Sequence, residues 1–228
     1  MATIAAPAKP ATTRAQLAAR LSLAGAGVFL VLLAALHLIK PEFAPSWRMV
    51  SEYAIGRHGW VQRLAFLTLA LSCVGLVVAI RPDVRTLGGR IGLACLLATA
   101  AGLTIAAIFP TDPITASRDE LTTQGKLHGV GSLIGIPSAP LAALLISLGL
   151  LRDRSWSGAR RPLVWTAGLV WAALLAFALT MAVLLPRSGG QFGPGVPIGW
   201  LNRLFLVAQC AWQMTVAWHE IQVGRRGP

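Results

Sequence analysis

Two copies of one short phrase each place an arginine at the start of a hydrophobic segment. The phrase Gly-Trp-x-x-Arg-Leu occurs at residues 59–64 and again at residues 199–204, so that Arg63 and Arg203 lie about one turn inside their segments. A charge at that depth in a membrane is costly, and it marks either a working site or a structural ion pair. Two guanidinium groups could together hold a phosphate or a carboxylate, because each donates paired hydrogen bonds.

Five further polar side chains lie where apolar segments begin or end. They are His37, Ser51, Glu52, Asp112 and His128. The topology argued below places all of them, with the two arginines, in one layer near the outer membrane surface. The acids are the available partners for the arginines, because a buried guanidinium needs a carboxylate or a phosphate. Two hypotheses follow: the arginines bind an anionic ligand, or they form structural pairs that lock loops onto helices.

The histidines and acids of this layer are also candidates for catalysis. His37, His128 and Asp112 could bind a catalytic zinc or another divalent metal with one open position. Alternatively, Ser51, His128 and Asp112 could act as nucleophile, base and orienting acid. The sequence contains neither an HExxH spacing nor a GxSxG elbow. A third interpretation is that each histidine only forms hydrogen bonds with a loop.

The last apolar segment carries polar residues at helical spacing. Asn202, Gln209 and Gln213 are seven and four residues apart, so they share one face of a helix. We expect this face to point into the protein rather than to lipid. Asn202 and Gln209 then become candidate ligand-binding residues.

An all-α membrane protein is expected to position these residues. Of the 228 residues, 55% are hydrophobic and 12% are charged, whereas a soluble domain carries about 25% charged residues. Six apolar segments are each long enough to cross a hydrocarbon core of about 30 Å. They comprise residues 21–40, 62–81, 90–109, 127–150, 162–185 and 198–218. We therefore predict a bundle of six transmembrane helices at 21–220, between a disordered basic tail at 1–20 and a short cytoplasmic tail at 221–228.

The distribution of basic residues predicts the orientation. The net charge is +12, but the cations are spread over many loops, so we expect a lipid bilayer rather than nucleic acid as the partner. With both termini inside, the inner segments hold 12 of the 20 cations, and the two short inner loops hold three and four of them. Cytoplasmic loops carry an excess of Lys and Arg. Both termini are therefore predicted to be cytoplasmic.

The third and fourth segments carry stripes of small residues at a spacing of four. Ala98, Gly102 and Ala106 form one stripe, and Gly131 and Gly135 form the other. Such stripes let two membrane helices approach closely, because little side chain separates the backbones. We expect these two helices to pack against each other.

Four motifs occur in a fixed order along the chain, and together they resemble one family of membrane proteins. They are Ser51-Glu52-Tyr53-Ala54 followed by Gly59-Trp60, Phe109-Pro110-Thr111-Asp112, Leu127-His128-Gly129, and residues 199–204 with Trp212. This set resembles the DUF998 family over most of the chain. The resemblance implies a multi-pass, six-helix protein of the bacterial cytoplasmic (inner) membrane, and it implies no mechanism.

A more distant similarity is to membrane hydrolases of the alkaline ceramidase and adiponectin-receptor type, which combine a serine, an aspartate and three histidines around zinc. This chain offers Ser51, Asp112 and His128, with His37 as a second histidine. The paired histidines that those hydrolases carry on their last helix are missing here, where the corresponding region has Gln209, Gln213 and His219. This departure counts against zinc hydrolysis.

The leading expectation is a polar pocket, open to the outer leaflet, that binds or moves an anionic amphiphile or lipid head group. Arg63 and Arg203 would hold the anion, and Glu52, Asp112 and His128 would orient it. The alternative is a membrane-embedded hydrolase or lipid-modifying enzyme in the same pocket, and a third hypothesis is a scaffold without chemistry. The absence of a Walker A loop and of a GxGxxG fingerprint argues against nucleotide or dinucleotide chemistry.

Overall fold

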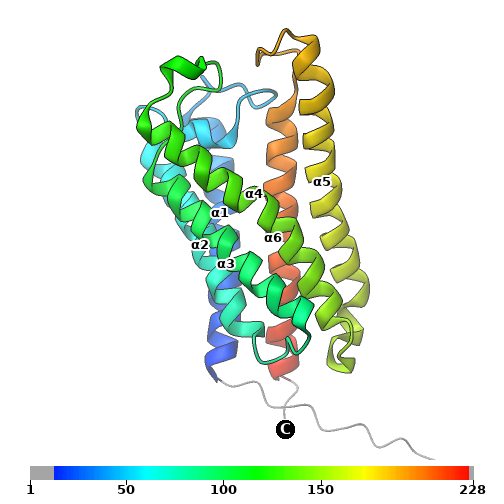
Figure 1. Cartoon of the computed structure of the whole chain (residues 1–228). Helices are drawn as coiled ribbons and strands as arrows, with labels where there is room; N and C mark the ends of the chain where they lie inside the picture. The colour runs from blue at the N-terminus through cyan, green and yellow to red at the C-terminus, as the bar shows by residue number, and fades with distance from the viewer. Residues whose placement is uncertain (1–12, 226–228) are drawn as a thin grey trace, which may run out of the picture.

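The computed structural model describes residues 13–225, which form helices joined by short loops (Figure 1). The long helices of this part are α1 (Thr13–Ile39), α2 (Gly59–Ile80), α3 (Leu87–Ile108), α4 (Thr123–Leu150), α5 (Arg160–Arg187) and α6 (Ile198–Arg225). Between them lie the 3₁₀ helices η1 (Val50–Ala54), η2 (Arg118–Glu120) and η3 (Arg154–Ala159). No described residue belongs to a β-strand, so the predicted all-α class is confirmed.

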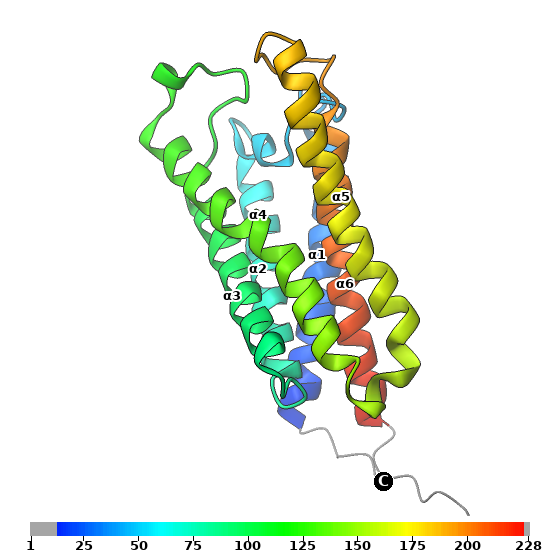
Figure 2. The same ribbon diagram turned by 45° about the vertical axis from the view of Figure 1, so that its right-hand side comes forward.

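The long helices run side by side and alternate in direction (Figures 1 and 2). Both ends of the described chain lie at one end of the bundle, which we call the inner end, with the connections at 81–86 and 151–159. The opposite, outer end carries the loops at 40–58, 109–122 and 188–197. The most extensive contacts join α3 to α4, α1 to α2, α5 to α6, α2 to α3, and α1 to α6. The first and last helices are therefore neighbours.

Within the described residues, five helical runs are long and apolar enough to cross a membrane. They are α1 to α4 and the run Arg154–Arg187, which joins η3 to α5. By length and composition the chain is a multi-pass membrane protein. α6 is less apolar because it carries Arg203, Gln209 and Gln213, and these side chains are buried inside the bundle. The sixth span and the cytoplasmic termini stay predictions.

Two predicted boundaries need correction. Residues 13–20 belong to α1 rather than to a disordered tail. Alanine is the strongest helix former, and three alanines of this segment are buried against the bundle. Residues 221–225 continue α6 instead of forming a separate tail. Residues 1–12 and 226–228, the rest of the two predicted tails, lie outside the described part of the chain.

Small residues bring α3 and α4 into close contact, as their stripes predict. A Cβ atom at Gly102 would lie 2.5 Å from the carbonyl oxygen of Gly131 and 2.8 Å from the Cα atom of Gly135. A larger residue would therefore force one backbone to move, and the predicted packing is confirmed. The α3–α4 pair forms one wall of the cavity described below.

Apolar side chains form two buried clusters, one that includes Trp156 and one that includes Tyr53. A polar link also joins α2 to α6 inside the bundle. The Ser72 hydroxyl donates to Gln213 Oε1 at 2.7 Å, and Gln213 Nε2 donates to Cys73 Sγ at 3.2 Å. Gln213 is fully buried, and both of its polar atoms have a partner.

Candidate functional site

Arg203 is 5% exposed, and within the described chain it donates only to uncharged groups. Nε donates to His37 Nε2 at 2.9 Å, and Nη2 donates to the Tyr53 hydroxyl at 2.8 Å. Nη1 lies 2.8 to 3.1 Å from three backbone carbonyl oxygens, two of which belong to the loop at 40–58. All three guanidinium nitrogens therefore tie this loop and the end of α1 to α6.

The contact with Arg203 fixes the proton of His37. A guanidinium group can only donate, so His37 Nε2 accepts and Nδ1 carries the ring proton. Nδ1 donates to the Leu33 carbonyl oxygen at 2.7 Å. Both ring nitrogens are thus engaged within the protein, and neither offers a lone pair to a metal ion.

Arg63, in the second turn of α2, caps the outer end of α3. Nε donates to the Ala107 carbonyl oxygen at 2.7 Å, and Nη2 donates to the Ile108 carbonyl oxygen at 3.3 Å. Cations stabilise this end of a helix because its last carbonyl groups lack helical partners. Arg63 and Arg203 share none of these hydrogen-bond partners, so within the described chain the two arginines hold different parts of the protein.

The glycines of the repeated phrase explain why it occurs twice. A Cβ atom at Gly59 would overlap the carbonyl oxygen of Ala54, and a Cβ atom at Gly199 would overlap the carbonyl oxygen of Pro45. Both helices therefore begin directly against the same loop, at 40–58. Each phrase seats this loop on a helix, which is a structural role.

Glu52 joins two outer loops. Its buried carboxylate accepts the N–H of Met49 at 2.8 Å and the N–H of Ile114 at 2.9 Å, and it lies 3.2 Å from Arg48 Nη1. Arg48 thus forms the ion pair with Glu52 that we expected from Arg63 or Arg203. The spacing of four residues between Arg48 and Glu52 could have indicated this ion pair in the sequence.

Asp112 lies over the first turn of α4. Its carboxylate accepts the N–H of Thr122 at 2.8 Å and the Thr122 hydroxyl at 3.0 Å. A Cβ atom at Gly125 would overlap Asp112 Oδ2, so only glycine leaves room for this carboxylate. A negative charge is stabilised at the N-terminus of a helix. Thr122 and Gly125 were missed by the sequence argument, although they follow Asp112 closely.

His128 is buried beneath the same loop. Its Nδ1 atom lies 2.9 Å from the Phe109 carbonyl oxygen, and its ring centroid lies 6.4 Å from that of Phe66. No hydrogen bond joins Asp112 to His128 among the described contacts, so the predicted Ser51, His128 and Asp112 set is not assembled. Nor do any three His, Cys, Asp or Glu side chains of residues 13–225 group to hold a metal ion. The metal set of His37, His128 and Asp112 is not brought together.

A cavity of about 330 Å³, which we call the outer cavity, lies between η1, α2, α3, α4 and α6. It is lined by six of the predicted site residues: Ser51, Glu52, Asp112, His128, Asn202 and Gln209. His37 and the two repeated arginines do not line it. Phe66, Leu103, Phe205 and Leu206 give it apolar walls. The arrangement of the helices thus brings six predicted polar residues to one cavity, but Arg63 and Arg203 are not among its lining residues.

Gln209 is a residue of the outer cavity whose polar atoms have no partner. Its side chain is 2% exposed, and neither its amide oxygen nor its amide nitrogen makes a hydrogen bond within the described chain. Asn202 differs, because its Oδ1 atom accepts the N–H of Val50 at 3.0 Å. Gln62 is also buried and unpaired, but it does not line the cavity. An unpaired buried amide costs about 1–3 kcal/mol, so Gln209 is the residue of the outer cavity with the most to gain from a partner.

Some of the residues that line the outer cavity belong to the motifs that carry the family resemblance, namely Ser51, Glu52, Thr111, Asp112, His128, Gly129 and Asn202. The sequence profile of a family described as "Protein of unknown function (DUF998)" matches residues 23–219. The chain belongs to this family. The DUF998 resemblance is thereby confirmed over all six long helices. No curated protein and no solved structure matches the chain. In this DUF998 protein, the motifs form η1, the start of α4 and the start of α6.

Proposed function

We propose that this DUF998 protein binds an amphiphilic molecule in the outer cavity. The head group forms hydrogen bonds with Gln209, and an apolar part packs against the cavity wall. The buried and unpaired Gln209 amide is the observation that carries the proposal. Small-molecule pockets span about 300–1,000 Å³, and a cavity of about 330 Å³ accommodates a head group rather than a whole lipid.

The charges around the outer cavity favour an uncharged or cationic head group. Glu52 and Asp112 line the cavity, whereas Arg63 and Arg203 donate to groups elsewhere. An anion in the cavity would face the carboxylates of Glu52 and Asp112. Arg48 pairs with Glu52 but does not line the cavity, and like charges repel strongly in a weakly hydrated site. We therefore replace the anionic amphiphile expected from the sequence with an uncharged or cationic one.

The outer half of α5 offers a route from the bilayer to the cavity. The buried residues of α5 are Leu163, Ala167, Val170 and Ala173, all of them in its inner half. Toward the outer end, α4 and α5 diverge (Figure 2). Phe192, in the loop that follows α5, lines the outer cavity. In this proposal the amphiphile enters between α4 and α5 and leaves its tail among lipids.

α6 completes the membrane domain in this proposal. Trp200 and Trp218 are both more than half exposed and lie 18 residues apart on α6. At 1.5 Å per residue they are about 27 Å apart, close to the thickness of a hydrocarbon core. Tryptophan is enriched at both membrane surfaces. These two residues support a sixth span. The basic inner loops support an orientation with both termini in the cytoplasm.

The test uses two glycines that have room for a side chain. A Cβ atom at Gly129 or at Gly168 meets nothing within 4 Å, but only Gly129 lines the outer cavity. We would purify the wild type, Gly129→Leu and Gly168→Leu in mild detergent and extract each with organic solvent. Mass spectrometry of the extracts would identify compounds that co-purify with the protein above the level of bulk lipid.

We expect one compound with an uncharged or cationic head group in the wild type and in Gly168→Leu, and its loss from Gly129→Leu. Equal retention by all three proteins would mean that the compound binds elsewhere, and the proposal would fail. Wild-type protein that carries nothing above bulk lipid, even after purification from native membranes, would also overturn it.

A hydrolase in the same cavity is the second candidate, because Ser51, Asp112 and His128 all line it. It requires His128 to give up its contact with the Phe109 carbonyl oxygen and to approach Ser51. An activity screen with ester and amide lipids would support this candidate only if Ser51→Ala abolished turnover while the compound bound by the wild type was still retained.

A further inference from the structure

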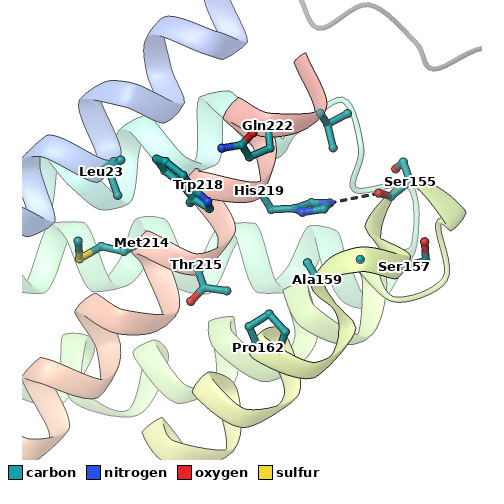
Figure 3. A pocket seen from close by; sticks show the side chains of 12 residues that line it. Leu23, Ser155, Ser157, Ala159, Pro162, Met214, Thr215, Trp218, His219 and Gln222 are labelled. Atoms are coloured by element: carbon teal, nitrogen blue, oxygen red, sulfur yellow. Dashed lines mark hydrogen bonds between the residues drawn. The ribbon is translucent and has the colours of Figure 1, made fainter. Parts of the chain in front are cut away.

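A second cavity, of about 680 Å³, lies at the inner end of the bundle and shares no lining residue with the outer cavity (Figure 3). We call it the inner groove. Residues of α6 lie along it, with α1 on one side and η3 with the start of α5 on the other. Its lining includes Leu23, Ser155, Ser157, Pro162, Trp218 and His219.

The part of the inner groove along α6 is apolar. Leu23, Met214 and Pro162 present hydrocarbon to it (Figure 3). Thr215 also lines this part, but its hydroxyl donates to the Ala211 carbonyl oxygen at 2.8 Å. A ligand in this part of the groove would therefore contact the methyl group of Thr215 rather than its hydroxyl group. This part of the groove suits an acyl chain.

The part of the inner groove at η3 is polar. His219 Nε2 lies 3.1 Å from the Ser155 carbonyl oxygen (Figure 3), and the His219 ring packs against Trp156 with centroids 4.6 Å apart. Ser157 lines the same part and is exposed. The imidazole is thus held in place at the boundary between the apolar and polar parts.

Two arginines lie between Ala159 and Pro162, which both line the inner groove. α5 begins with Arg160 and Arg161, which are exposed, and neither forms an ion pair with another described residue. The first turn of α5 contains no acid and no side-chain cap, so the positive end of the helix adds to the two guanidinium charges.

Two acids lie near this part of the chain, Glu220 and Asp153. Glu220 follows His219 and is buried, and burial raises its pKa to about 8. The N–H of Ser155 lowers the pKa of Asp153, which stays charged and caps η3.

Two exposed tryptophans place the inner groove at a membrane surface. Trp218 lines the groove and is 53% exposed, and Trp165 on α5 is 78% exposed. Tryptophan rings gather at the level of lipid head groups. A groove at this depth, with an apolar floor and with two arginines adjacent in sequence to its lining residues, matches a lipid better than it matches a soluble anion or a peptide.

We propose that the inner groove binds an anionic phospholipid of the cytoplasmic leaflet. The phosphate lies beside Ser157 and the guanidinium groups of Arg160 and Arg161, and one acyl chain lies along α6 between Leu23 and Pro162. The site uses the predicted orientation of the chain and is independent of the ligand in the outer cavity. Such a lipid would hold the start of α5 against α1 and α6.

The experiment measures quenching of Trp218 fluorescence by brominated lipids. Wild type and Trp218→Phe would be reconstituted into phosphatidylcholine vesicles that contain increasing fractions of brominated phosphatidylglycerol or brominated phosphatidylcholine. The difference between the two proteins isolates Trp218. The same series would be run for Arg160→Gln/Arg161→Gln, and for Arg90→Gln, a matched exposed arginine in the first turn of α3 at the same end of the bundle.

We expect quenching of Trp218 to require about tenfold less brominated phosphatidylglycerol than brominated phosphatidylcholine, as a fraction of total lipid. The reason is that each arginine near a membrane surface favours anionic lipid. The preference should vanish in the double variant and persist in Arg90→Gln. Equal quenching by the two lipids, or a preference that survives in the double variant, would overturn the proposal. So would the absence of quenching by either lipid, since the chain itself would then cover the groove.

Discussion

Replacing Gln209 with leucine is expected to stabilise the ligand-free protein while abolishing ligand binding. Gln209 buries an amide oxygen and an amide nitrogen without partners in the described chain. Removing such a group relieves about 1–3 kcal/mol, and leucine has a similar size. For a chain of this length, 1 kcal/mol shifts the midpoint of thermal unfolding by about 2–4 °C. We therefore expect the midpoint to rise by several degrees.

Gln213 provides the matched control, because it lies one turn further along α6 and both of its amide atoms are paired. Gln213→Leu breaks two hydrogen bonds that contribute about 1 kcal/mol each, so it should lower the midpoint by several degrees. It does not line the outer cavity and should leave ligand binding intact. The two substitutions thus have opposite expected effects on both stability and binding.

Unfolding can be followed with a maleimide dye that becomes fluorescent on reaction with a thiol. All proteins in this assay would carry Cys95→Ala, because Cys95 is only half-buried. The remaining cysteines, Cys73 and Cys210, are fully buried and react only after the bundle opens. The proteins would first be exchanged into fresh detergent until mass spectrometry detects no bound compound, so that ligand does not stabilise the wild type. If Gln209→Leu lowered the midpoint as much as Gln213→Leu does, Gln209 would have a partner within the protein, and the argument for a ligand would collapse.

Three further predictions concern the polar residues of the outer end. Arg203→Lys should sharply reduce the yield of folded protein, since an ammonium group cannot make the separate contacts of the guanidinium; a yield equal to that of the wild type in size-exclusion chromatography would contradict this. Gly125→Ala should lower the unfolding midpoint, and adding Asp112→Ala should recover most of the loss; additive effects in this double-mutant cycle would show that the two residues do not interact. Detergent-purified wild type should contain well below one zinc or iron per chain by elemental analysis, because His128 and Asp112 are directed at other partners; a stoichiometric metal lost in His128→Ala would refute this.

The fold could be predicted from the sequence because its main determinant is the length of apolar segments. Five runs meet this criterion in the structure, and the small residues at Gly102 and Gly131 indicated which helices touch. The helical start of α1 was missed, because residues 13–20 are basic and resemble a tail. Their alanines face the bundle, and this burial depends on tertiary packing that a local pattern does not reveal.

The composition of the outer cavity was predictable, whereas the roles of the arginines were not. Alternating helices bring every second chain connection to the same end, so Ser51, Asp112 and His128 had to lie in one layer. Arg203, however, donates mainly to backbone carbonyl groups and to Tyr53, the single tyrosine of the chain. Residue types do not reveal which backbone carbonyl groups of an irregular loop accept hydrogen bonds, because every residue has one. Because a buried guanidinium group was expected to need a carboxylate or a phosphate, the sequence favoured an anionic ligand for these arginines.

The polar residues of α6 separate into two groups once their partners are known. Arg203 and Gln213 satisfy their polar atoms by fastening α6 to the loop at 40–58 and to α2. Gln209 lies between them on the same helix, and its amide group forms no hydrogen bond with another described residue. A leucine there would pack better and insert more easily into a membrane. Gln62 is also buried without a partner among the described residues, but of the two glutamines only Gln209 lines the outer cavity. The proposed complex, in which a ligand pairs with the amide, accounts for Gln209, and the ligand would lie in the cavity that Gln209 lines.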